Sequence, residues 1–140
     1  MLTVMEKVDL LQNVELFREI RTQSLAAIAA VAQEIDFDPH QMVYAEGEAA
    51  DALYVLLEGE VTLSTSRGLY RRLGENQVAG AFSLLADTTR RETARAGLAT
   101  HTLRIDKPDL LDLLAEDVHI TRGIIRALVR MIPTAGDSTG

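Results

Sequence analysis

The chain has 140 residues, 47% of them hydrophobic, which is the length of one domain and enough apolar side chains for a core. Its formal net charge of −7 argues against a surface that gathers nucleic acid, because duplex binding depends on many contacts between Lys or Arg and phosphate. The absence of cysteine excludes disulfides and thiolate metal sites, and the sequence has neither a signal-peptide pattern nor a run of about 20 apolar residues.

The first part of the chain, residues 1–33, predicts two helices. Val4, Val8 and Leu11 recur at helical spacing between charged residues, which is typical of a short amphipathic helix. We expect Thr22 to cap a second helix, because threonine is favoured at that position. Its predicted apolar stripe consists of Leu25, Ile28, Ala29 and Ala32.

After residue 35 the pattern changes from helix to sheet, with a turn at Pro39 and a strand through Val43 and Tyr44. The clearest signal is ALYVLLEGEVTLST, in which two β-rich runs flank Glu58 and Gly59. Since glycine takes the positive φ that a tight turn demands, this stretch predicts a β-hairpin. Further strands are expected over Leu69–Leu73, Thr93–Ala99 and Thr102–Ile105, with a turn at Gly74–Asn76.

Two helices are predicted over residues 107–132. Pro108 tolerates the first helical turn, and we expect Asp106 to cap it. The longest helix follows in VHITRGIIRALVRMI, which places Ile120, Ile124, Leu128 and Met131 on one face and Arg122, Arg126 and Arg130 on another. The arginines form either a solvated stripe or a docking face for an acidic partner helix. The last residues, 133–140, are small and polar and predict a disordered tail.

The order is therefore helices, about seven or eight short strands over residues 34–106, and helices again. This order predicts a single α+β domain, a compact antiparallel barrel or jelly roll flanked by N-terminal and C-terminal helices. No internal repeat interrupts it.

Residues 78–94, VAGAFSLLADTTRRETA, form a candidate anion site. A turn at Gly80 that enters a short helix over Phe82–Leu85 directs main-chain N–H groups outward, where partial positive charge gathers. An arginine can meet a singly charged phosphate with two parallel donors, and Thr93 can add a hydroxyl. Arg90 and Arg91 are the available arginines, and either can face inward.

This segment and DALYVLLEGEVTL resemble the cyclic nucleotide-binding domain of bacterial catabolite activators, cyclic-nucleotide-dependent kinases and gated channels. RIDKPDLLDLLAED with the long helix after it resembles the hinge and lid helices that end that domain. The resemblance spans nearly the whole chain and implies a phosphate-binding cassette for cAMP or cGMP. It implies that Arg90 pairs with phosphate, Gly80 is the cassette glycine, Ser83 is the small residue after it, and Thr93 touches phosphate or base. The implied contact set is Gly80, Ala81, Phe82, Ser83, Arg90, Arg91 and Thr93.

The cassette departs from the family pattern at three positions. Ala81 stands where the family usually has a glutamate that holds the ribose 2′-hydroxyl, and losing that bond weakens binding by about ten- to a hundredfold. Glu92 stands where the family prefers a small residue, and we expect it to pair with Arg90 or Arg91 and compete with phosphate. Thr89 replaces the proline before the arginine, which leaves the register of the two arginines open.

Simpler interpretations apply to the same residues. The two arginines can be solvated charge, and Gly80 can serve the turn alone. His40, His101 and His119 lack the spacing of a metal site, so no metal is predicted. No nucleophile and base share a predicted cleft, so we predict no enzyme activity.

The predicted function is a regulatory domain that binds cAMP or cGMP weakly. The final helix is expected to close over the ligand, so that binding shifts the population from the open to the closed conformation. The alternative is a domain without ligand that serves packing, dimerisation or protein interaction. We expect a cytoplasmic domain of a longer protein, such as a transporter-like membrane protein, with a homodimer through the C-terminal helix as a further expectation. No cofactor and no nucleic-acid contact are predicted.

Overall fold

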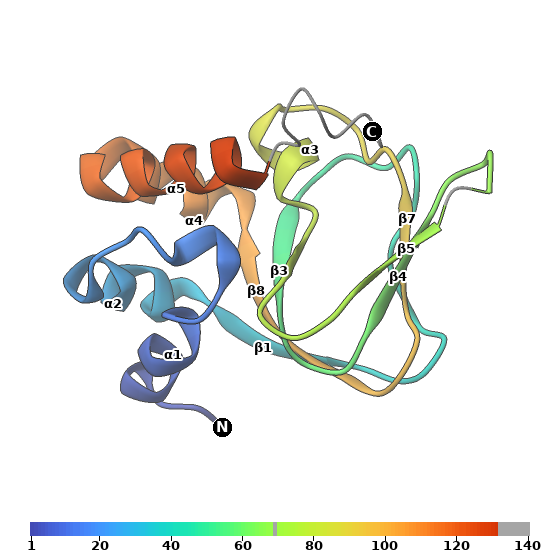
Figure 1. Cartoon of the computed structure of the whole chain (residues 1–140), viewed down its shortest axis with the longest axis horizontal. Helices are drawn as coiled ribbons and strands as arrows, with labels where there is room; N and C mark the ends of the chain where they lie inside the picture. The colour runs from blue at the N-terminus through green and yellow to red at the C-terminus, as the bar shows by residue number, and fades with distance from the viewer. Residues whose placement is uncertain (69, 132–140) are drawn as a thin grey trace.

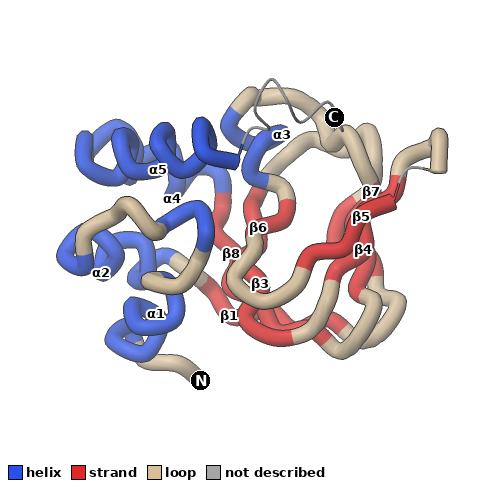
Figure 2. The backbone as a smooth tube through the Cα atoms, in the orientation of Figure 1, coloured by secondary structure: helices blue, strands red, loops and turns tan. Residues whose placement is uncertain are grey.

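The computed structural model describes residues 1–68 and 70–131, and in this part of the chain helices lie at one end of a β-roll (Figure 1). The predicted α+β class is confirmed, with strands in two antiparallel sheets of four (Figure 2). The helical elements are α1 (Val4–Leu11), the 3-10 helix η1 (Glu15–Phe17), α2 (Thr22–Val31), α3 (Ala81–Leu85), α4 (Lys107–Glu116) and α5 (Val118–Met131). The strands are β1 (Gln33–Phe37), β2 (Met42–Tyr44), β3 (Ala52–Glu58), β4 (Val61–Ser64), β5 (Tyr70–Leu73), β6 (Val78–Ala79), β7 (Thr93–Ala96) and β8 (Thr100–Asp106). The predicted tail and Leu69 lie outside the described residues.

The two sheets have the strand orders β1-β8-β3-β6 and β2-β7-β4-β5. Successive side chains of a strand point to opposite faces, and β3 uses both faces for burial. Leu53 and Val55 pack with the helices on the outside of the first sheet. Tyr54 and Leu56 pack between the sheets, inside the roll. The molecule therefore has two apolar cores that share one strand.

The predicted hairpin over ALYVLLEGEVTLST is wrong, although both of its strands exist. β3 pairs with β6 and β8, whereas β4 pairs with β5 and β7, so the turn at Gly59 carries the chain from one sheet to the other. Gly59 has φ +99°, and a Cβ there would lie 2.5 Å from Thr100 Oγ1 and 2.6 Å from the Ala99 carbonyl oxygen. Glycine is needed because the turn before β8 presses against it.

Of the two predicted helix caps, the one at Thr22 is wrong, and Asp106 occupies the N-cap position of α4 without a capping hydrogen bond. Thr22 is the first residue of α2, and its hydroxyl accepts a hydrogen bond from Gln12 instead of capping the helix. The Asp106 carboxylate accepts from Arg104 Nε at 2.6 Å and makes no capping bond to α4. Side chains do cap the start of α1, where Thr3 and Glu6 form a reciprocal capping box, and the start of α5, where the Asp117 carboxylate accepts from the His119 main-chain N–H at 2.9 Å. Strand β1 is not predicted from the sequence, because buried and exposed side chains do not alternate regularly along it.

Helix α5 packs against η1 through the apolar face that its periodicity predicts. Ile120 and Ile124 are buried, and Leu128 and Met131 are partly buried. Gly123 allows the close crossing, since a Cβ there would lie 2.7 Å from Ile20 Cγ1. Arg122, Arg126 and Arg130 are exposed, and Arg130 pairs with Glu19.

Candidate functional site

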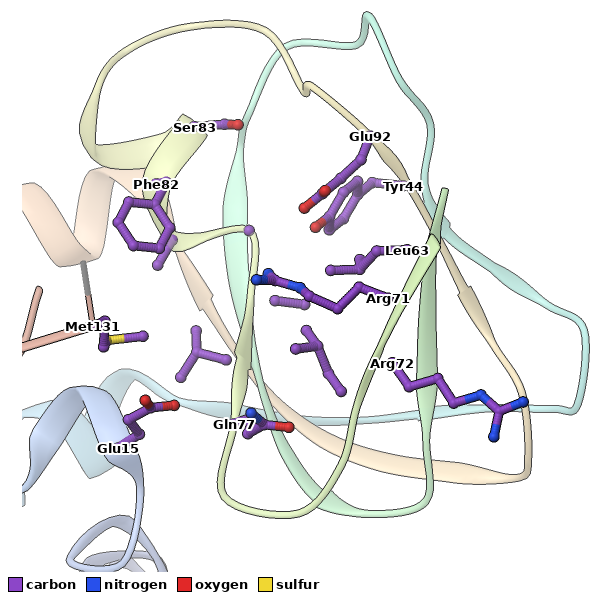
Figure 3. Close-up of a pocket in the computed structure, with 15 residues that line it drawn as sticks. Glu15, Tyr44, Leu63, Arg71, Arg72, Gln77, Phe82, Ser83, Glu92 and Met131 are labelled. Atoms are coloured by element: carbon purple, nitrogen blue, oxygen red, sulfur yellow. The ribbon is translucent and has the colours of Figure 1, made fainter. Parts of the chain in front are cut away.

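A cavity of about 180 Å³ lies between the cassette segment and the second sheet (Figure 3). Its walls come from β5, β6, α3 and the segment that leads into β7, and Leu63 of β4 lies between them. Glu15 of η1 and Met131 at the end of α5 line its other end. The site thus joins residues from the roll and from two helical elements.

The cassette turn has the predicted form. Gly80 adopts φ +87° immediately before α3, where a Cβ would lie 2.4 Å from Arg90 Nη1. Gly80, Ala81, Phe82 and Ser83, four of the residues that the resemblance implies as nucleotide contacts, line the cavity. Ala81 is buried and brings no carboxylate, whereas half of the Phe82 side chain is exposed.

Arg90 faces inward, but toward the protein rather than into the cavity. Arg90 is 2% exposed. Its Nη1 donates a hydrogen bond to the Gly80 carbonyl oxygen at 2.9 Å, and its Nη2 donates one to the Ala52 carbonyl oxygen. The guanidinium carbon lies 4.0 Å from the centre of the Tyr44 ring, a cation–π arrangement, and Asp51 Oδ1 lies 3.7 Å from Nη2. Arg90 therefore ties the cassette turn to β3.

The two remaining predicted contacts also lie outside the cavity lining. Arg91 is exposed, which answers the question of register in favour of Arg90 as the inward residue. The hydroxyl of Thr93 accepts a hydrogen bond from the Glu46 main-chain N–H at 3.0 Å. The expected ion pair between Glu92 and an arginine is wrong, because no such contact within 4 Å occurs among residues 1–68 and 70–131.

Instead, Glu92 points into the cavity beside Tyr44, and Arg71 enters it from β5 (Figure 3). Sequence reasoning missed Arg71, yet strand alternation identifies it: Leu73 is buried, and Arg71 lies two residues before it on the same face. Glu92 is likewise two residues before the buried Ala94. Arg72 points away from the cavity (Figure 3), and its Nε donates to the Tyr70 hydroxyl.

The electrostatics of the cavity centre on Tyr44. Burial and, to a lesser extent, the nearby Glu92 carboxylate raise the pKa of its phenol to about 12, while Arg90 and Arg71 oppose the change. The phenol is therefore a neutral hydrogen-bond donor at physiological pH. Within the described part of the chain it has no hydrogen-bond partner, although Tyr44 is only 6% exposed.

Outside the cavity, one histidine lies beside two carboxylates. His101 contacts Asp36 and lies 3.2 Å from Glu34, but no cluster of three side chains that could hold a metal ion occurs among the described residues. None of the described helices has the length and apolar character needed to cross a membrane.

The family model of the cyclic nucleotide-binding domain matches residues 34–117, which is more than half of the chain. The chain belongs to the cyclic nucleotide-binding domain family. Among curated members, the chain is 23% identical over 129 residues to a CRP-like cAMP-activated global transcriptional regulator of Mycobacterium tuberculosis. This match covers 89% of this chain and 58% of the relative. The chain is also 29% identical over 119 residues to a potassium channel protein of Rhodopseudomonas palustris. That match covers 83% of this chain and 29% of the relative. The chain thus spans little more than half the length of the first relative.

Solved structures of cyclic nucleotide-binding domain relatives share the fold. The regulatory subunit of a cAMP-independent protein kinase A from Trypanosoma brucei superimposes with a TM-score of 0.78 at 17% identity, over 91% of this chain and 46% of that one. The N-terminal domain of a transcriptional regulator from Streptomyces coelicolor gives a TM-score of 0.75 at 24% identity, over 93% of this chain and 94% of that one. At these identities the likeness establishes the roll with its flanking helices.

Proposed function

We propose that the chain is a non-catalytic regulatory domain that binds cAMP or cGMP weakly at best and responds to what occupies the cassette cavity. The observation that carries this proposal is the bonding of Arg90, the residue that the family resemblance implies as the phosphate-pairing arginine. Its terminal nitrogens donate to the carbonyls of Gly80 and Ala52, and its side chain is outside the cavity lining. These bonds hold the buried side chain away from the cavity, so a phosphate could reach it only if the guanidinium moved, which lowers affinity. Arg90 Nε is buried without a hydrogen-bond partner among the described residues and remains available as a donor.

The charges in the cavity oppose a monoanion as well. Arg71 faces it, but so do the carboxylates of Glu92 and Glu15, whereas the Arg72 guanidinium projects outward (Figure 3). A cyclic phosphate would therefore meet more negative than positive side chains. Ala81 removes the carboxylate that the family uses for ribose, so polar contacts on both parts of the nucleotide are reduced.

A regulatory role is supported by the position of the cavity. Met131 of α5 and Glu15 of η1 line it together with the cassette, so an occupant contacts helices as well as the roll. A ligand that fits one arrangement of these elements better than another shifts the population by that difference in affinity. The relatives named for transcription and channel proteins support a cytoplasmic domain of a longer protein that transmits such a shift.

Thermal shift and isothermal titration calorimetry with cAMP and cGMP test the weak binding. A ligand at about one hundred times its Kd adds about 2.7 kcal/mol to the free energy of unfolding, which raises Tm by several degrees. We expect a rise below about 1 °C at about 1 mM nucleotide for the wild type. Glu92→Ala and the double variant Ala81→Glu/Glu92→Ala should bind at least about tenfold more tightly.

The matched control is Arg91→Ala, which removes an exposed charge next to Glu92 and should leave affinity unchanged. The Tm without ligand reports whether each variant folds. A rise of several degrees in the wild type at about 10 µM cAMP would contradict weak binding, because it requires a Kd far below that concentration.

A second candidate function, dimerisation through the C-terminal helix, is favoured by an exposed apolar stripe on α5. Val118, Ile125 and Val129 are each more than half exposed and recur at intervals that share one helical face. Light scattering after gel filtration at increasing concentration should detect a dimer, and Ile125→Glu should abolish it. A monomer at every concentration would remove this candidate.

A further inference from the structure

The cavity presents opposite charges separated by an apolar floor. In the second sheet, Leu63 of β4 pairs with Arg71 on one side and with Ala94 on the other. Arg71 lies on β5 and Glu92 immediately precedes β7, and β4 separates these two strands. The backbones of β5 and β7 are therefore about 10 Å apart. Leu63 lies between them, and both charged side chains point into the cavity (Figure 3).

Neither charge is neutralised by a neighbour within the described residues. Arg72, on the same strand as Arg71, is held by the Tyr70 hydroxyl and lies 3.7 Å from Glu60. Arg71 and Glu92 have no ion-pair partner within 4 Å among residues 1–68 and 70–131. The Tyr44 hydroxyl points into the same space beside Glu92 and has no hydrogen-bond partner in that part of the chain (Figure 3). Three polar groups thus face the cavity with bonding capacity unused.

We propose that this cavity binds a small zwitterion, whose carboxylate or phosphate meets Arg71 and whose ammonium meets Glu92 and the Tyr44 hydroxyl. The linker between the two charges lies over Leu63. An occupant displaces water from both side chains, so a ligand that pairs with only one leaves the other desolvated and unpaired. This inference rests on the proposed role of the cavity as the sensing site.

The length of the linker is tested with unbranched ω-amino acids, from glycine to 6-aminohexanoate, by thermal shift and calorimetry. We expect a maximum at one chain length, because the two partner groups are fixed on one sheet. Butyrate and butylamine, which carry one charge each, should bind at least about tenfold more weakly than the best ω-amino acid. If no ω-amino acid binds better than these two compounds, the proposal is wrong.

Two substitutions separate the roles of the charged residues. Glu92→Gln should reduce the preference for 4-aminobutyrate over butyrate by about tenfold, and Arg71→Ala should reduce its preference over butylamine by about as much. A merely structural effect would change all three affinities together. Arg72→Ala is the matched control for Arg71→Ala, since it removes the neighbouring charge that projects outward.

The outcomes also separate this inference from the proposed function. Tight cAMP binding by the wild type would overturn the proposed function whatever the ω-amino acids do. Weak cAMP binding together with no preference for ω-amino acids would leave the regulatory role standing and overturn the zwitterion site alone. Unchanged preferences in both Glu92→Gln and Arg71→Ala would overturn it as well.

Discussion

Arg90 has the burial and the partners of an arginine that holds the fold together. We expect Arg90→Ala to lower the free energy of unfolding by roughly 2–4 kcal/mol, because it leaves the carbonyls of Gly80 and Ala52 without their buried donors. Arg91→Ala should change it by less than about 0.5 kcal/mol, since that side chain is exposed. Urea denaturation measures both. Equal stability of the two variants would show that the Arg90 guanidinium is free to meet an anion.

Tyr44 makes stability depend on alkaline pH. Its pKa in the folded protein is about 12, against about 10 for an exposed tyrosine, so the folded state keeps its proton where the unfolded chain has lost it. The protonated Tyr44 phenol contributes about 2–3 kcal/mol to the free energy of unfolding. This contribution is complete below pH 10 and is lost as the pH rises toward 12. Tyr44→Phe should therefore lose less stability than the wild type between pH 9 and about 11.5 in urea titrations. Parallel curves for the two proteins would contradict this assignment.

The residues of the site differ in how far sequence can place them. Arg71 and Glu92 follow from alternation with buried Leu73 and Ala94, a local pattern. The same alternation reaches Arg90, two residues before Glu92, but the carbonyls that hold its guanidinium belong to Gly80 and Ala52, 10 and 38 residues away. Local patterns therefore predict which side chains face the cavity, whereas burial of the arginine depends on tertiary contacts.

At the scale of elements, the turn at Gly59 shows that local sequence predicts the positions of strands but not how the strands pair. The two apolar runs around Glu58 predict both strands correctly, and a glycine with positive φ fits a hairpin as well as a crossing between sheets. Pairing is decided by β8 and β7, which lie about 40 residues further along the chain and compete for the edges of β3 and β4. The sequence around the turn contains no information about that competition.

The crossing predicts a difference between two glycines that share a positive φ. Gly59→Ala meets Thr100 Oγ1 and the Ala99 carbonyl, whereas Gly47→Ala, at φ +90°, meets nothing within 4 Å. Both variants pay the strain of the left-handed region, about 1 kcal/mol, and Gly59→Ala should lose roughly 2 kcal/mol more through the clash. Urea midpoints measure the difference. Equal losses would mean that the turn before β8 does not press on Gly59.

At the scale of the whole molecule, the order of helices, strands and helices was enough to predict the class of fold. Periodicity identified the helices and most strands, because amphipathic faces are set by local spacing. The two cores could not be predicted in the same way. In β3, Leu53 and Val55 belong to the helical core while Tyr54 and Leu56 belong to the roll, and a continuous apolar run does not reveal which layer covers each face.

Because one strand contributes to both cores, we expect the helices and the roll to unfold together. Circular dichroism at 222 nm reports the helices, and tyrosine fluorescence reports the roll, since the chain has no tryptophan and Tyr44 and Tyr54 lie in the roll core. The two urea curves should have the same midpoint, as two-state unfolding requires. Tyr70→Phe removes the signal of an exposed tyrosine and leaves the buried pair as reporters. An earlier loss of helical signal would mean that the helices open while the roll persists, so that a ligand in the cavity could release them without unfolding the sheets.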